Sequence, residues 1–165
     1  MRVLVLVGAL VAGAGTAAAD WQNTRWGMSV DELRAADPNL QEPDDAEQRT
    51  QSGTMGAPRL KGTHSMGGKD FGSYFYFRDG GLARVSLEAI DRTGGNSILP
   101  NLKAMYGQPE REANDRFQSC DRWSVSWRDE KTRNAIRFNA GVCEEERHRS
   151  FNRAQVHYEP LPAAK

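Results

Sequence analysis

Residues 120–143 read CDRWSVSWRDEKTRNAIRFNAGVC, and this stretch predicts a β-hairpin. In its first part, apolar residues occupy every second position: Trp123, Val125 and Trp127. Its second part repeats that period with another apolar set: Ile136, Phe138, Ala140 and Val142. A period of two residues is typical of strands that bury one face and expose the other. The polar residues 129–134 between the two parts predict the turn.

The apolar residues also predict the register of this hairpin. With the turn centred between residues 131 and 132, three apolar pairs lie opposite one another on one face: Trp127 with Ile136, Val125 with Phe138, and Trp123 with Ala140. The same register places Cys120 opposite Cys143 on the other face, and a shift by one residue would break both relations. We therefore expect a disulfide bond between Cys120 and Cys143, which stabilises the fold by about 3 kcal/mol in the chain-entropy model.

A short helix is expected near the start of the mature chain. Ser29 and Glu32 have the spacing of a capping box, and Met28 and Leu33 are placed as its hydrophobic staple. The dipeptide Asp37-Pro38 ends this helix, because the residue before proline avoids the helical conformation. The acidic and polar residues that follow, 39–52, are expected to form a loop.

The remaining segments predict further strands and a second helix. Strands are expected in four segments: residues 59–66, 71–78, 82–90 and 153–159. Asp79-Gly80-Gly81 joins the middle two as a hairpin turn. One apolar stripe predicts a helix over residues 97–106, which ends at Gly107 and Pro109.

The order of these elements predicts a single α+β domain at residues 20–165, with two short helices packed on an antiparallel β-sheet. A helix followed by three strands occurs twice, which predicts tandem half-repeats at residues 20–93 and 94–160. An offset of 71 residues supports this, because it places residues 154–159 on 83–88. The alternative is a chance similarity between unrelated hairpins.

Residues 1–19, MRVLVLVGALVAGAGTAAA, have the features of a secretory signal peptide. Arg2 precedes an apolar run, and Ala17-Ala18-Ala19 forms a cleavage signal before Asp20. The run is shorter than the roughly 20 residues that span a bilayer, so we expect cleavage and no membrane span afterwards. A retained anchor is the alternative. The sequence therefore predicts a periplasmic or secreted protein, in a compartment where disulfide bonds form.

The composition excludes several classes of protein. The 22 Lys and Arg residues balance the 22 Asp and Glu residues, whereas nucleic-acid-binding proteins usually have a basic excess. A charged fraction of 27% is too high for an integral membrane protein, and 4 Trp, 6 Phe and 4 Tyr are too many for a disordered chain. The sequence contains no phosphate-binding or dinucleotide-binding fingerprint, so we expect no cofactor.

Two short motifs resemble those of a known group of exported bacterial domains. Trp26-Gly27-Met28-Ser29 leads into the first helix, and Tyr106-Gly107-Gln108-Pro109 closes the second. Together with the repeated order of helix and strands, they are similar to the β-lactamase inhibitory protein and SmpA/OmlA-like group. The resemblance implies that a sheet surface binds other envelope proteins without catalysis. No inhibitor-specific loop matches, so an inhibitory role is not carried over.

A small serine hydrolase is one alternative function. Thr63-His64-Ser65-Met66-Gly67 resembles the nucleophile elbow of lipases, with threonine at the first glycine position. Ser65 would be the nucleophile, and His157 could serve as its base. The elbow needs a buried strand before the serine and a helix directly after it, and the sequence predicts neither. We therefore expect a glycine-rich turn between strands, no catalytic residue and no enzyme activity.

A periplasmic protein that binds a metal or another small ligand is the second alternative. The segment from Glu144 to His148 offers carboxylate and imidazole groups, but Cys143 cannot bind a metal while it is disulfide-bonded. The three histidines also lack the H-x-x-x-H spacing of a metal-binding helix. We therefore expect a solvated surface here and no metal site.

The sheet face opposite the helices is the best candidate binding surface. If the alternating apolar residues face the helices, the other face carries a polar and aromatic set: Tyr74, Tyr76, Arg84, Ser124, Ser126, Arg137 and Asn139. Tyr and Arg are enriched in the hot spots of protein interfaces, although an ordinary solvated sheet face is the alternative. The sequence thus predicts a non-catalytic binding or accessory module of the cell envelope with a protein partner.

Overall fold

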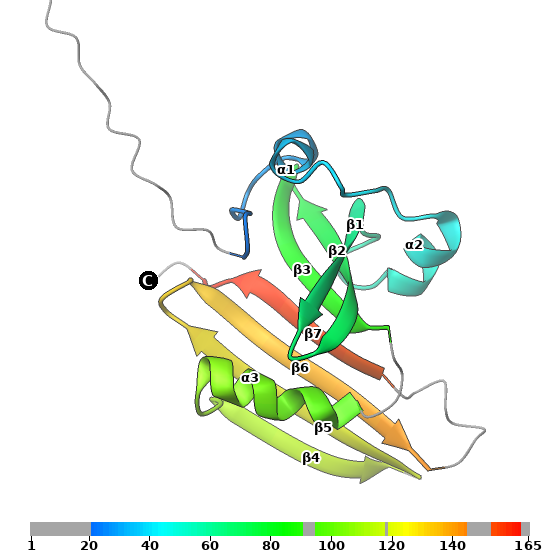
Figure 1. Ribbon diagram of the computed structural model, residues 1–165, viewed down its shortest axis with the longest axis vertical. Coiled ribbons are helices and arrows are strands. Elements are labelled where there is room, and N and C mark those ends of the chain that lie inside the picture. Colours follow the sequence, from blue (N-terminus) through cyan, green and yellow to red (C-terminus); the bar gives the residue numbers. More distant parts are fainter. Residues whose placement is uncertain (1–20, 91–94, 118, 145–152, 163–165) are drawn as a thin grey trace, which may run out of the picture.

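The computed structural model describes residues 21–90, 95–117, 119–144 and 153–162. Within these residues, seven strands form one antiparallel sheet in the order β1-β2-β3-β7-β6-β5-β4 (Figure 1). The strands have the following bounds: β1 Leu60–Met66, β2 Lys69–Arg78, β3 Gly81–Ala89, β4 Arg111–Phe117, β5 Cys120–Asp129, β6 Asn134–Cys143 and β7 Arg153–Pro160. The predicted signal peptide lies outside the described residues.

Three short helices in the described part of the chain accompany the sheet, which confirms the predicted α+β class. Their bounds are α1 Val30–Ala36, α2 Asp45–Gln51 and α3 Leu99–Tyr106, the last preceded by a 3-10 turn at Gly95–Ile98. α1 and α3 pack against the same face of the sheet, here called the front face (Figure 1). The core beneath them consists of alternating sheet residues: Phe71, Phe75, Val85, Leu87, Val125, Trp127, Ile136, Phe138, Val156 and Tyr158. This core extends from β1 to β5 and does not include the edge strand β4.

The capping box predicted at α1 is confirmed. The backbone N–H of Glu32 donates to Ser29 Oγ at 3.2 Å, and the backbone N–H of Ser29 donates to Glu32 Oε2 at 2.8 Å. These bonds satisfy two of the amide groups that a helix leaves unpaired at its start. Met28 and Leu33, the predicted staple, are both buried, and the helix ends directly before Asp37-Pro38.

The prediction that residues 39–52 form a loop is wrong. α2 begins after Asp44, whose carboxylate accepts from the backbone N–H of Glu47 at 2.9 Å, while Glu47 Oε2 accepts from the backbone N–H of Asp44 at 3.0 Å. None of the residues of α2 is buried. The helix therefore lacks the apolar period by which α3 could be predicted.

The hairpin of β5 and β6 has the predicted register. Trp127 pairs with Ile136, and Val125 pairs with Phe138. Cys120 pairs with Cys143, and a disulfide bond joins them. Apolar pairing on one face was thus sufficient to place the two cysteines together on the other face.

β4 was not predicted from the sequence. It pairs with β5 along its whole length, from Arg111 opposite Ser126 to Phe117 opposite Cys120. All seven of its residues are exposed, because β4 is an edge strand and its sequence REANDRF lacks an apolar period. The other sheet edge differs: β1 exchanges two backbone hydrogen bonds between Lys61 and Gln41 on its outer side.

Six of the seven strands are arranged symmetrically about an axis between β3 and β7, and β4 is an additional strand at one edge. β3 pairs antiparallel with β7, and the order outward is β2 then β1 on one side and β6 then β5 on the other. A half-turn about an axis normal to the sheet therefore superimposes the two strand orders. Ser86 and His157 are 71 residues apart and also pair across β3 and β7, so this axis passes between them.

Candidate functional site

The face of the sheet opposite α1 and α3, here called the back face, carries the predicted binding residues. In the observed register, Tyr74 pairs with Ser86 and Tyr76 pairs with Arg84. Ser124 pairs with Asn139, and Ser126 pairs with Arg137. Paired residues share a face, and residues two apart in a strand share it too. The structure therefore places the whole predicted set on one face, but α2 divides it into a covered part and an open part.

α2 covers the back face of β1, β2 and β3. Tyr76 is only 4% exposed, and its hydroxyl donates to the carbonyl oxygen of Gln51 in α2 at 3.0 Å. This burial raises the pKa of Tyr76 to about 12. Tyr74 is half-buried, and Lys61 beside it forms an ion pair with Glu47 of α2. Tyr76 is therefore excluded from the exposed surface, and Tyr74 contributes only part of its ring.

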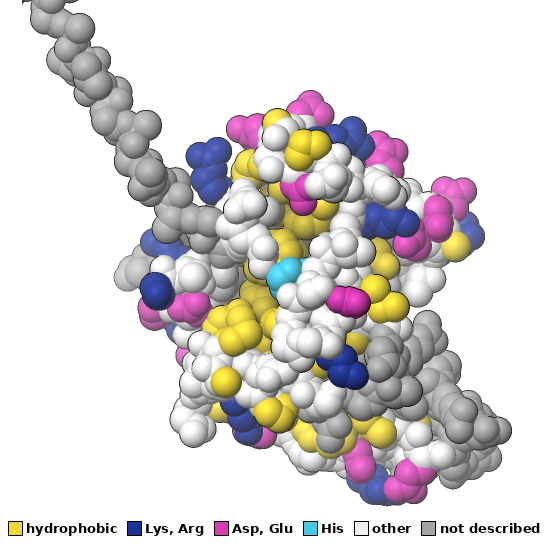
Figure 2. Space-filling view, viewed as in Figure 1, with side chains coloured by type: hydrophobic (Ala, Val, Ile, Leu, Met, Phe, Trp, Pro, Cys, Tyr) yellow, Lys and Arg dark blue, Asp and Glu magenta, His cyan; other side chains and the backbone are white. Residues whose placement is uncertain are grey.

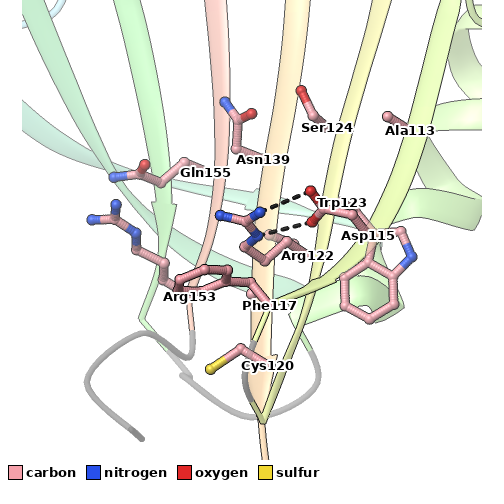
Figure 3. A pocket seen from close by; sticks show the side chains of 12 residues that line it. Ala113, Asp115, Phe117, Cys120, Arg122, Trp123, Ser124, Asn139, Arg153 and Gln155 are labelled. Atoms are coloured by element: carbon pink, nitrogen blue, oxygen red, sulfur yellow. Dashed lines mark hydrogen bonds and ion pairs between the residues drawn. The ribbon is translucent and has the colours of Figure 1, made fainter.

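The back face of β4, β5, β6 and β7 is open and hollowed (Figure 3). The hollow measures about 670 Å³, within the range of about 300–1,000 Å³ that is usual for ligand pockets. Polar and apolar residues line it in equal number: Ala113, Asp115, Phe117, Cys120, Arg122, Trp123, Ser124, Asn139, Ala140, Gly141, Arg153 and Gln155. Of the predicted binding residues, it includes Ser124 and Asn139.

An arginine–carboxylate pair lies across the floor of the hollow. Arg122 Nε and Nη2 donate to the two carboxylate oxygens of Asp115, each at 2.8 Å (Figure 3). This bidentate bond raises the pKa of Arg122 above its usual range. The guanidinium also lies 5.1 Å from the ring centroid of Phe117, where a cation is attracted by the ring. Phe117 is 56% exposed, so an apolar contact is available beside the charges.

Arg153 lies at the side of the hollow, away from this pair (Figure 3). Within the part of the chain that the structure describes, its guanidinium forms no ion pair. Gln155 lies next to it and donates from its amide nitrogen to Glu88 Oε2 of β3 at 3.4 Å, and Asn139 pairs with Gln155 across β6 and β7. As far as the described residues go, the hollow therefore offers one cation without an ion pair and several hydrogen-bonding groups.

A polar cluster connects the open part to the covered part at the sheet centre. Ser86 Oγ and His157 Nδ1 are 2.8 Å apart. Glu159 accepts from Arg84 Nε at 2.6 Å and from Arg137 Nη2 at 2.8 Å. Burial lowers the pKa of His157 to about 4, and the charges of Arg84 and Arg137 act in the same direction. His157 is therefore neutral at neutral pH, and the charge of Glu159 is shared by two arginines.

Ser65 is not positioned as the nucleophile of an elbow. Its hydroxyl donates to Asp70 Oδ1 at 2.5 Å, across the hairpin of β1 and β2. The strand–turn–helix that an elbow requires is replaced by a strand–turn–strand. His157 lies three strands away, about 14 Å across the sheet alone. The neighbouring His64 points to the front face, where its ring contacts Trp21 at a centroid distance of 5.5 Å.

The front face carries two small hollows beside His64. They measure about 80 and about 150 Å³ and share the side chains of Trp21 and His64. Figure 2 shows hydrophobic side chains around this histidine. The rings of Trp21 and Phe75 lie in edge contact at 5.8 Å, so the hollows are gaps in a packed aromatic cluster.

The described residues contain neither a cluster of metal ligands nor a membrane-spanning helix. No group of three or more His, Cys, Asp and Glu side chains there is arranged to hold a metal ion. Residues 145–152, which include most of the segment considered as a metal site, lie outside the described part of the chain. No helix in the described part is long and apolar enough to cross a membrane.

The open site contains residues that sequence reasoning missed. Arg122 belongs to the same alternation as Ser124 and Ser126, so the pattern carried a signal for it. Asp115 and Phe117 lie on β4, which had no signal at all.

Comparison with known proteins gave no relatives. No family model matches the chain, and neither a curated protein nor a solved structure matches it.

Proposed function

We propose that this protein is exported to the periplasm or beyond and acts there as a non-catalytic binding or accessory module. Its partner is a protein of the cell envelope, bound by the open back face of β4, β5, β6 and β7. The proposal is supported by the contrast between a covered and an open part of one sheet face. The open part combines arginines with an exposed aromatic ring, and Arg and aromatic residues dominate binding energy at protein interfaces.

Affinity capture from an envelope extract tests this function. The double variant Asn139→Glu/Ser124→Glu places two carboxylates on the floor of the open face without touching the core. Asn114→Glu/Thr54→Glu is the matched control, because Asn114 is on the front side of β4 and Thr54 is an exposed residue beyond α2. We expect one partner to be retained by the wild type and the control and lost from the first variant. Equal capture by all three proteins would contradict the proposed surface.

A further inference from the structure

The sheet symmetry identifies which residues of the second half correspond to those beneath α2. The half-turn that exchanges Ser86 and His157 also exchanges their partners on the next strands, Tyr74 on β2 and Arg137 on β6. Two residues further along these strands, the half-turn relates Tyr76 to Asn139. The tyrosines are covered by α2, whereas both counterparts are exposed. The two halves therefore share the order of three strands, and they differ in what covers their back face.

The contacts of α2 show what kind of segment this back face holds. α2 begins with acidic residues, and Glu47 forms an ion pair with Lys61 of β1. At its other end, the backbone carbonyl oxygen of Gln51 accepts a hydrogen bond from the hydroxyl of Tyr76. The side-chain amide of Gln51 donates a second hydrogen bond to the carboxylate of Glu88 on β3. α2 contains no buried residue, so these polar contacts hold it in place. The first half thus already contains an acidic segment that is bound to the back face through a basic residue of the sheet.

The second half has basic residues without such a segment. Arg153 on β7 and Arg111 on β4 are both exposed and form no ion pair with another described residue. The nearby carboxylates are already bound: Asp115 pairs with Arg122, and Glu159 pairs with two arginines. Among the described residues, the open face therefore has a local excess of uncommitted positive charge, although the chain as a whole has a formal net charge of zero.

We infer that the partner presents a short acidic segment that lies across Asn139, with carboxylates bound by Arg111 and Arg153. β4 and β7 are three strand spacings apart, and the two arginines are offset by four residues along the strands, so their Cα atoms are about 20 Å apart. A helix of about 13 residues spans that distance. Charge complementarity over this span favours acidic protein segments and selects against basic ones. This inference rests on the proposed function and specifies the chemistry of its partner.

Binding of synthetic peptides tests the inference. The probes are helical peptides of about 14 residues with Asp or Glu near both ends, and matched peptides with Asn or Gln at the same positions. The purified protein is compared with Arg111→Gln/Arg153→Gln. The control is Arg49→Gln/Arg59→Gln, which removes two exposed arginines outside the open face and changes the net charge equally. Thermal unfolding checks that all three proteins fold alike.

We expect the wild type and the control to bind the acidic peptides at least about tenfold more tightly than the amide peptides, and this preference to be lost from Arg111→Gln/Arg153→Gln. Equal binding of both peptide sets, or no binding of either, would contradict the inference that the partner presents an acidic segment. If Arg111→Gln/Arg153→Gln still prefers the acidic peptides, the inferred binding site at these two arginines is wrong. Tighter binding of a single-stranded oligonucleotide than of any acidic peptide would overturn a protein partner for these arginines. If the wild type still captures an envelope partner in any of these cases, the proposed function stands and only the inferred acidic segment is wrong.

Discussion

The two halves of this sheet share an apolar front face and differ on their back face. In the first half α2 lies over Tyr74 and Tyr76, while in the second half the counterparts Arg137 and Asn139 are exposed. The front helices differ from α2 in how they are held, since Leu33 of α1 is buried and α2 has no buried residue. The comparison teaches that this sheet holds apolar segments on one face and polar segments on the other.

The largest effect is expected where the halves are alike, in the core of the front face. Phe138→Ala in the second half removes a fully buried ring and should lower the free energy of unfolding by about 3–5 kcal/mol. Leu87→Ala in the first half should lower it by about 2–5 kcal/mol. Because one core connects both halves, each variant should still unfold in a single urea transition, seen together by tryptophan fluorescence and circular dichroism. Two separate transitions, with only one of them shifted, would mean that the halves are independent.

The disulfide belongs to the second half alone, since the chain has no cysteines besides Cys120 and Cys143. Reduction should lower the free energy of unfolding by about 3 kcal/mol, because it releases a loop closed over a sequence separation of 23. The aromatic core should keep the reduced protein folded, at a lower melting temperature. The double variant Cys120→Ala/Cys143→Ala should have a melting temperature close to that of the reduced wild type, and adding reductant should not change it. An unchanged melting temperature on reduction would contradict a stabilising bond.

His157 lies on the axis between the halves and should make stability depend on pH. Its pKa is lowered from 6.5 to about 4 in the folded protein, so between these pH values the unfolded chain binds a proton that the native chain does not. Stability should therefore fall as the pH decreases from 6.5 to about 4, by up to about 1.4 kcal/mol per pH unit. Urea unfolding across this range would measure the slope. His157→Gln should remove this contribution, and Ser86→Ala should retain it because the histidine stays buried.

How far the sequence predicts this fold depends on apolar periodicity. The register of β5 and β6 followed from a few alternating residues, because shifting a half-buried strand by one residue exposes its apolar face. α2 and β4 were missed for the opposite reason, since one buries no residue and the other exposes every residue. A local signal for α2 did exist: Asp44 and Glu47 have the same spacing as Ser29 and Glu32, and both pairs form capping boxes.

The candidate site was predictable to the same extent. Alternation placed Ser124 and Asn139 on the back face, and the structure shows that both line the hollow. Asp115 could not be placed, because its strand had no apolar period. The cover over Tyr76 could not be predicted either, because it depends on a hydrogen bond between residues 25 positions apart that no local pattern reports.

The smallest effects compare the covered and open halves directly. Tyr76→Phe removes the hydroxyl that donates to the carbonyl of Gln51, so it should cost about 1 kcal/mol and speed the amide exchange of α2. Asn139→Ala changes the exposed counterpart and should shift stability by no more than about 0.5 kcal/mol. Urea unfolding and hydrogen exchange measure both. A cost for Asn139→Ala equal to that of Tyr76→Phe would contradict an open face. A smaller cost leaves Asn139 free to contact a partner, because its side chain then adds little to the fold.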